Sequence, residues 1–125
     1  MIYKFELNFD KGRDRMEESV LGELFGNTPK VQIFDAFSDG IGEAWSKKEI
    51  QEITGLSKAT ILSNWNPLEK YGIIKVKKQI GNTTLYTLDL ENKVTKLLLK
   101  FEMELAFKIA PTGEEETKTK ETIHA

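Results

Sequence analysis

Two helix-start signals flank a glycine in the middle of the chain. Ser46-Lys47-Lys48-Glu49 is a capping box, in which the serine and glutamate side chains each bind a free backbone N–H at the start of a helix. Gly55-Leu56 favours a sharp turn, and Ser57 is placed to cap a following helix. The sequence therefore predicts a helix of about eight residues, a tight turn, and a second helix from Lys58 to about Trp65.

Two proline-containing segments predict further helix starts. Thr28-Pro29 combines an N-cap hydroxyl with a proline at the first helical position, and the helix that follows should end at Ser38-Asp39-Gly40. Asn66-Pro67-Leu68-Glu69 has the same pattern, so we expect a kink near Asn66 and a last turn that ends at Gly72. The inward faces of these helices should carry Val31, Phe34, Phe37, Ile50 and Ile53.

A hairpin is expected after these helices. Residues 73–78 and 84–90 are rich in strand-forming side chains and flank a glycine-bearing turn over residues 79–83. In such a strand, Lys75 and Lys77 would alternate onto one face. Residues 40–45 show no period, so they form a loop or short extended piece with Trp45 turned inward.

The ends of the chain lie outside this central pattern. Tyr3, Phe5, Leu7 and Phe9 alternate with polar residues, which predicts a half-buried strand whose partner the sequence does not identify. A short amphipathic helix should follow over residues 14–25 and end at Gly26-Asn27. Residues 111–125 have almost no apolar content and are expected to be disordered.

A long helix over residues 92–110 carries two apolar stripes on nearly opposite sides. The first stripe comprises Val94, Leu97, Leu98, Phe101, Leu105 and Ile109. The second comprises Leu99, Met103, Ala106, Phe107 and Ala110. Two apolar faces need two partners: one is the core of the chain, and the other is most simply a second copy. We assign the second stripe to the interface of a homodimer.

Composition excludes several classes of protein. The 125-residue chain suffices for one modest core, and its lack of cysteine removes disulfides, thiolate catalysis and cysteine-ligated metals. A fold held by packing alone suits a reducing compartment, so we expect a cytoplasmic protein with no membrane partner. His124 is the single histidine, and Asp35, Asp39 and Glu43 lack the spacing of a metal-binding loop. We therefore expect neither an enzyme nor a metal or other cofactor.

Charge is distributed unevenly along the chain. The formal net charge is −2, which taken alone would argue against a nucleic-acid partner. Residues 46–80, however, contain seven lysines and three glutamates, a net charge of +4. This basic block indicates an anionic partner, although lysines are also ordinary solvated surface residues.

The order of elements resembles a winged helix-turn-helix domain, in which the last helix of three enters the major groove and a hairpin wing lies along the DNA backbone. Residues 24–90 resemble the ArsR-like and MarR-like transcriptional regulators of archaea and bacteria. The resemblance rests on Leu56-Ser57-Lys58-Ala59-Thr60-Ile61, on Leu68-Glu69-Lys70-Tyr71-Gly72-Ile73-Ile74, and on the spacing between them. The metal-binding cysteines of ArsR-like sensors are absent, so that chemistry is not implied.

The resemblance implies which positions face DNA. The candidate contacts are Lys47, Ser57, Lys58, Ala59, Thr60, Ser63, Asn64, Lys75, Lys77, Lys78, Asn82 and Thr83. Hydroxyl and amide side chains can bind phosphates or base edges, and lysines can bind phosphates. Capping and ordinary solvation are the alternative roles of the polar side chains, and protection of a strand edge is that of the wing lysines.

The sequence thus predicts an α+β, mainly α, fold. Residues 1–27 form an N-terminal extension, 28–90 a winged helix-turn-helix domain, 91–110 a dimerisation helix and 111–125 a tail. The function we expect is that of a homodimeric regulator that binds specific sequences of double-stranded DNA. The rival is a protein-interaction adaptor, favoured by Leu62 and by the single cation of helix 58–65, Lys58. The sequence leaves open whether a small-molecule effector binds.

Overall fold

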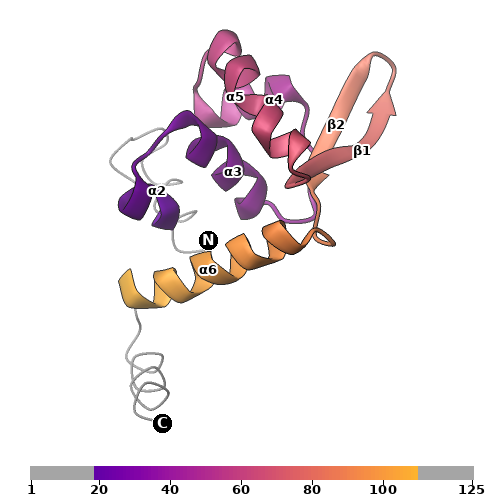
Figure 1. The fold of residues 1–125 in the computed structure, drawn as a ribbon. Helices are drawn as coiled ribbons and strands as arrows, with labels where there is room; N and C mark the ends of the chain where they lie inside the picture. Colours follow the sequence, from indigo (N-terminus) through magenta and orange to yellow (C-terminus); the bar gives the residue numbers. More distant parts are fainter. Residues whose placement is uncertain (1–18, 110–125) are drawn as a thin grey trace.

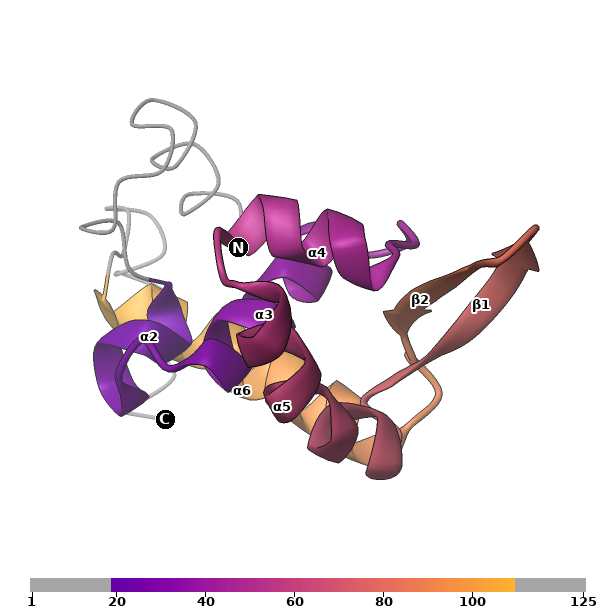
Figure 2. The same cartoon turned by 90° about the horizontal axis from the view of Figure 1, so that it is seen from above.

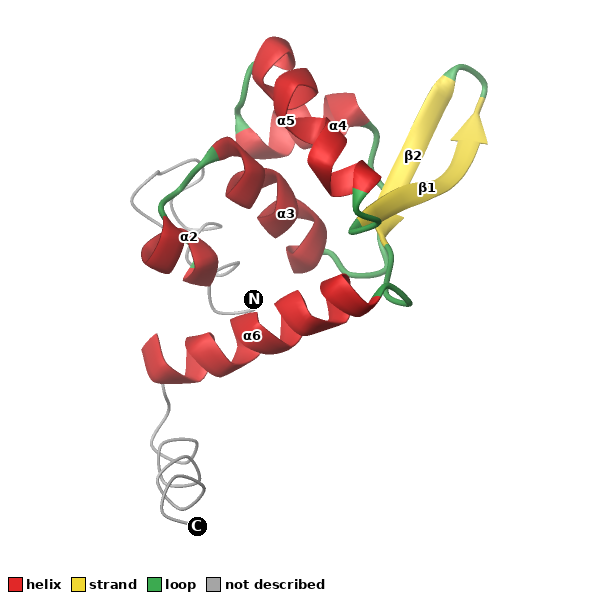
Figure 3. Cartoon of the chain, viewed as in Figure 1, coloured by secondary structure: helices red, strands yellow, loops and turns green. Residues whose placement is uncertain are grey.

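The structure is a computed structural model that describes residues 19–109, and Figure 1 shows its arrangement. In chain order its elements are α2 (Val20–Phe25), α3 (Pro29–Asp39), α4 (Lys47–Thr54), α5 (Lys58–Lys70), β1 (Ile74–Ile80), β2 (Thr83–Leu88) and α6 (Lys93–Ile109). The helices form the body, and the two strands extend from it as a hairpin (Figures 2 and 3). This is the expected mainly helical winged-helix fold, with the hairpin as its wing.

Three of the four helix starts predicted from the sequence, those at Thr28, Ser46 and Ser57, are present. Thr28 caps α3, and Ser46 and Glu49 form the reciprocal capping box of α4, with N–H to oxygen distances of 2.8 and 3.1 Å. Gly55 ends α4 with a φ of 78°, which favours glycine because it has no Cβ. Ser57 then accepts a hydrogen bond from the backbone of Thr60 and starts α5. Gly55 and Ser57 therefore determine where α4 ends and where α5 begins.

The helix that begins at Lys58 is longer than expected. It does not end near Trp65 with a second start at Asn66, because α5 continues through Pro67 to Lys70. A proline inside a helix removes one backbone hydrogen bond, here the one that would reach the carbonyl of Ser63. Packing of Trp65 and Leu68 on either side of Pro67 holds the helix together across this gap.

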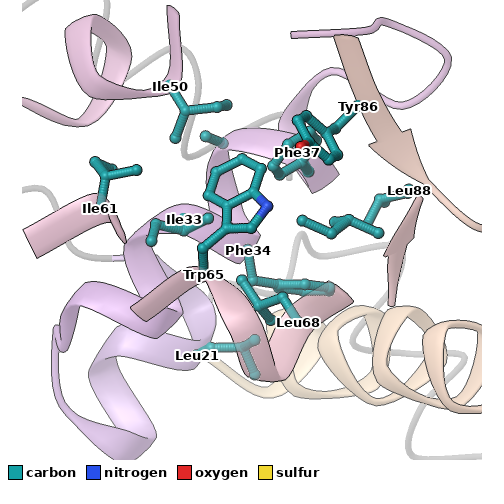
Figure 4. Close-up of a cluster of buried hydrophobic side chains, with 12 residues drawn as sticks. Leu21, Ile33, Phe34, Phe37, Ile50, Ile61, Trp65, Leu68, Tyr86 and Leu88 are labelled. Atoms are coloured by element: carbon teal, nitrogen blue, oxygen red, sulfur yellow. The ribbon is translucent and has the colours of Figure 1, made fainter. Parts of the chain in front are cut away.

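The hydrophobic core surrounds Trp65 (Figure 4). The Trp65 ring lies 5.9 Å from that of Phe37 in α3 and 5.0 Å from that of Tyr86 in β2, edge to face in both cases. The cluster also holds Leu21, Ile33, Phe34, Ala36, Ile50, Ile61, Leu68, Ile74 and Leu88. Helix α3 packs against α2, α4, α5 and β2, so it is the central element of the body.

One predicted core residue faces solvent. Ile50 is fully buried as expected, whereas Ile53 is 50% exposed. A helical step of three residues turns the side chain by about 60° from Ile50, which moves it past the edge of the face that α3 and α5 cover. Ile33 of α3, which the sequence pattern did not select, is fully buried.

The wing contains an irregularity that the sequence did not predict. Antiparallel pairing runs from Ile74 with Leu88 to Ile80 with Thr83, so the turn is only Gly81-Asn82. The register shifts between Val76 and Lys78, which leaves Lys77 without a paired residue. The expected alternation of Lys75 and Lys77 on one face is therefore wrong, because a bulge resets the alternation.

Trp45 extends the sheet on its other side. Its backbone N–H and carbonyl both bond to Tyr86, each at 2.8 Å, as an isolated antiparallel bridge. Its side chain is half-buried, in keeping with the inward position expected for it. The bridge ties the loop before α4 to the wing and so holds the wing beside the helix pair.

Helix α6 is anchored to the domain at its start. The Asn92 side chain caps α6 by accepting hydrogen bonds from Val94 and Thr95, at 2.8 and 3.1 Å, and its amide donates to the carbonyl of Tyr71. The Thr95 hydroxyl donates to the carbonyl of Ile73. Polar contacts thus fix the position of α6 relative to the end of α5.

The faces of α6 differ from the sequence assignment. Ala106 is buried and Leu99 packs against the core, although both belong to the stripe assigned to a second copy. Val94, Leu97 and Phe101 of the other stripe are exposed. The reason is that two polar residues, Thr95 and Glu102, are buried on the inward face, so hydrophobicity alone did not identify that face.

Several expectations fall outside the described residues. These are the strand over residues 3–9, the start of the helix over 14–25, Ala110, and the tail over 111–125. The described part of that early helix is α2, which Ser19 caps and which ends before Gly26 as expected. Among the helices of residues 19–109, none is long and apolar enough to cross a bilayer.

The core predicts the effect of removing its central ring. Trp65 is 3% exposed, so Trp65→Ala leaves a cavity and should lower the free energy of unfolding by about 3–5 kcal/mol. The matched control is Leu62→Ala on the exposed side of α5, which should change the free energy of unfolding by less than about 0.5 kcal/mol. Urea unfolding followed by circular dichroism measures both. A loss below about 1 kcal/mol for Trp65→Ala would contradict this account of the core.

Candidate nucleic-acid interface

The interface candidate is the side of the molecule formed by α5 and the wing. In Figure 1 the start of α5 and the tip of the wing point away from α6, whose own start lies beside the base of the wing. Ser57, Lys58, Ala59 and Ser63 are exposed on α5, as direct contact with DNA requires. Thr60 and Asn64 are only half exposed, because they lie toward α3.

Asn64 is held by hydrogen bonds within the chain. Its side-chain amide donates to the carbonyl of Thr60 at 2.8 Å, and its side-chain oxygen accepts from Nζ of Lys30 at 2.9 Å. The Ser63 hydroxyl also donates to the carbonyl of Thr60, and the Ser57 hydroxyl donates to the hydroxyl of Thr60. The polar side chains singled out from the sequence therefore form a local network along the α3 side of α5.

Lys30 is a basic residue at this site that sequence reasoning missed. It lies in the first turn of α3, and its ammonium reaches Asn64 across 34 positions of sequence. The basic block drawn from the sequence begins only at residue 46, so the charge count gave no reason to include Lys30. Only the packing of α3 against α5 brings it there.

Lys47 occupies a different place from the other candidate lysines. Its ammonium lies 5.3 Å from the centroid of the Trp65 ring and 5.7 Å from that of Tyr86. Such a cation–π contact is worth roughly 1 kcal/mol. Lys47 is half-buried and held above the aromatic core, so it contributes charge near the interface from a fixed position.

The wing lysines are not equivalent. Lys75, at the base of β1, lies 3.6 Å from a carboxylate oxygen of Asp89. Lys77 and Lys78, next to the bulge, are exposed, as are Asn82 and Thr83 around the turn. The outer half of the wing therefore carries the charge that is available to an anion.

Two exposed residues of α5 complete its outward face. Leu62 and Asn66 share that face with Ala59 and Ser63, since positions i, i+3, i+4 and i+7 align on a helix. Neither was among the candidate contacts. The signal that would have found them is the helical period itself, counted outward from Ile61 and Trp65 on the buried side.

A hollow of about 430 Å³ lies between α4 and α5. It is lined by Lys47, Lys48, Gln51, Glu52, Lys58, Ile61 and Leu62. Three of these side chains are cationic and one is anionic, so the apolar side chains of Ile61 and Leu62 share the hollow with net positive charge. In residues 19–109 no group of three or more histidine, aspartate or glutamate side chains is placed to hold a metal ion.

Tyr86 is a titratable group whose ionisation is changed by its environment. Burial raises the pKa of its hydroxyl above the ordinary value of 10.0, and the charge of Glu69 raises that pKa further. The folded chain therefore favours the neutral phenol at the junction of α4, α5 and the wing.

Comparison with known proteins identifies the fold. No protein-family model and no curated protein sequence matches the chain. The structure is similar to that of a MarR family regulator from Neisseria meningitidis, with a TM-score of 0.50 and 18% sequence identity. The alignment covers 83% of this chain and 75% of that one. At this identity the likeness establishes the winged-helix fold and nothing finer.

The raised pKa of Tyr86 predicts a loss of stability in alkali. Above pH 10.0 the unfolded chain loses the Tyr86 proton before the folded chain does, so the free energy of unfolding should fall as the pH rises from about 10 toward the raised pKa. Urea unfolding at pH 9 and pH 11 measures this fall. Tyr86→Phe should reduce this fall in the free energy of unfolding. The matched control Tyr71→Phe, at an exposed tyrosine, should leave the fall unchanged. Equal falls in Tyr86→Phe and wild type would show that Tyr86 is not the responsible group.

Proposed function

We propose that this chain is a cytoplasmic transcriptional regulator, not an enzyme, that binds specific sequences of double-stranded DNA as a homodimer. Helix α5 would enter a major groove, and the outer half of the wing would lie along the adjacent backbone. The observation that carries the proposal is the exposure of Lys58, Lys77 and Lys78 on the α5 and wing side of a winged-helix fold. The structural neighbour, a regulator with the same fold, supports it.

The charge distribution favours DNA over other partners of this surface. Residues 46–80 carry a net charge of +4 within a chain of net charge −2. A locally basic surface attracts phosphates, while the acidic remainder of the chain keeps non-specific attraction modest. Recognition would therefore depend strongly on contacts made by particular side chains.

The proposed dimer uses the exposed apolar surface of α2 and α6. Phe25 of α2 stacks on Phe101 of α6 with ring centroids 6.1 Å apart, yet both rings remain exposed. We call the surface formed by Leu24, Phe25, Val94, Leu97 and Phe101 the α2–α6 patch; all five side chains are exposed. Contiguous apolar surface of this kind marks sites of protein association, and a second copy is the simplest partner. Two half-sites would then lie about one helical turn, roughly 34 Å, apart on the DNA.

A second candidate function is that of a protein-interaction adaptor. Leu62 is 48% exposed and lines the hollow between α4 and α5, and an exposed leucine suits a protein partner. Winged-helix folds serve both purposes, so the fold does not decide between them. Binding to duplex DNA decides between the two functions, because only the regulator requires it.

Salt-dependent DNA binding tests the proposed function. The full chain should bind labelled duplexes, and the logarithm of its affinity should fall linearly with the logarithm of salt concentration. Lys77→Ala and Lys78→Ala should each lower the slope by about one, because each removes one phosphate contact. Lys75→Ala is the matched control, since Lys75 is paired with Asp89, and it should lower the slope less. Absence of binding to duplexes of random sequence would refute the proposed function.

The oligomeric state tests the proposed dimer. The wild-type chain should sediment as a dimer at micromolar concentration, and Leu97→Glu should make it a monomer, because it buries a charge in the α2–α6 patch. Met103→Glu is the matched control: Met103 is 51% exposed on the stripe of α6 that the sequence assigned to the interface, outside this patch. A wild-type monomer would refute the dimer. Dissociation by Met103→Glu alone would instead support the interface assigned from the sequence.

A further inference from the structure

The outward face of α5 is unusual for a helix that enters a major groove. Over the first three turns this face presents Ala59, Leu62, Ser63 and Asn66, and two of these exposed side chains are apolar. The opposite face, with Ile61, Trp65 and Leu68, is committed to the core. Rotation of α5 to present other residues is therefore not available, and the bases would meet this row.

The side chains that ordinarily distinguish bases by paired hydrogen bonds are scarce on α5. Arginine, which pairs with guanine, occurs in this chain only at positions 13 and 15. Asn64 is suited to adenine, but its amide and its side-chain oxygen are bonded to Thr60 and Lys30. Contact of Asn64 with a base would break both bonds, so Ser63 and Asn66 are the polar side chains of the outward face that remain for paired hydrogen bonds.

Leu62 shares a hollow with positive charges. It lines the hollow together with Lys48 and Lys58, and Glu52 is the one anionic side chain of that lining. Lysines beside a groove-facing residue can hold the phosphates of the DNA backbone. The leucine side chain, 48% exposed, would then lie against the edges of the bases rather than in solvent.

We infer that α5 selects its DNA sites by the methyl groups of thymine, which Leu62 and Ala59 contact; this inference rests on the proposed function. The thymine C5-methyl is the apolar group that the base edges present in the major groove, and small or apolar side chains recognise it. The class of target is therefore a half-site with A·T pairs at the positions that face Leu62 and Ala59. Leu62 has the exposure expected of either a protein site or a DNA site, and its lysine neighbours favour DNA.

Replacement of thymine by uracil tests this inference directly. Bound sequences are first selected from random duplexes with the full chain, and each thymine of the selected site is then changed to uracil. Uracil keeps every pairing atom and removes only the methyl. Affinity should fall about fourfold for each methyl that is contacted, at one or two positions in each half-site, and should be unchanged elsewhere.

Two variants assign the effect to its side chain. Leu62→Ala should abolish the difference between thymine and uracil at the position that it contacts. Ser63→Ala, an adjacent exposed change on the same helix face, should keep that difference. A difference that persists in Leu62→Ala would overturn the assignment to Leu62.

The outcomes separate this inference from the proposed function. Salt-dependent binding of the selected site with equal affinity for its uracil form would overturn the inference and leave DNA binding intact. Selected sites without thymine in the half-site would also overturn it. Failure to bind duplexes of any sequence would refute both.

Discussion

The burial of Trp65 between Phe37 and Tyr86 is the interaction on which the rest of the structure depends. These three rings come from α5, α3 and β2, which are distant in sequence, and their contact fixes the wing and α5 relative to one body. The indole nitrogen of Trp65 has no hydrogen-bond partner among the described residues, so packing and the ammonium of Lys47 hold the ring. Since Trp65 sets the rotation of α5, it also determines which α5 side chains face outward.

The same arrangement divides the lysines into two groups. Lys47 and Lys75 are engaged within the chain, one over the aromatic rings and one beside Asp89. Lys58, Lys77 and Lys78 are exposed. A count of charge along the sequence treats all five alike, whereas an approaching phosphate meets chiefly the second group. The net charge of +4 over residues 46–80 therefore overstates the positive charge that is not engaged within the chain.

The sequence predicted what local chemistry determines and missed what packing determines. The caps at Ser46 and Ser57 and the left-handed Gly55 depend on neighbours within a few residues, and all were predicted. The continuation of α5 through Pro67 depends on its packing against α3, and the bulge at Lys77 depends on the register with β2. The faces of α6 were assigned wrongly in part, because its inward face buries Thr95 and Glu102, polar side chains that hydrophobicity does not count. For the candidate site, the residue types of α5 and the wing were predicted, but the contact between Lys30 and Asn64 required the fold.

A regulator built in this way would separate affinity from specificity. Lysines on the wing and at the start of α5 would supply attraction that is indifferent to sequence, because phosphates carry no sequence information. Discrimination would fall to the outward row of α5, which contains no arginine and whose neighbouring Asn64 is engaged internally. Apolar contacts distinguish bases by shape and by the presence of a methyl, and they do not depend on salt. Lowering the salt concentration would then raise the affinity for all duplexes while leaving the ratio between sites nearly constant.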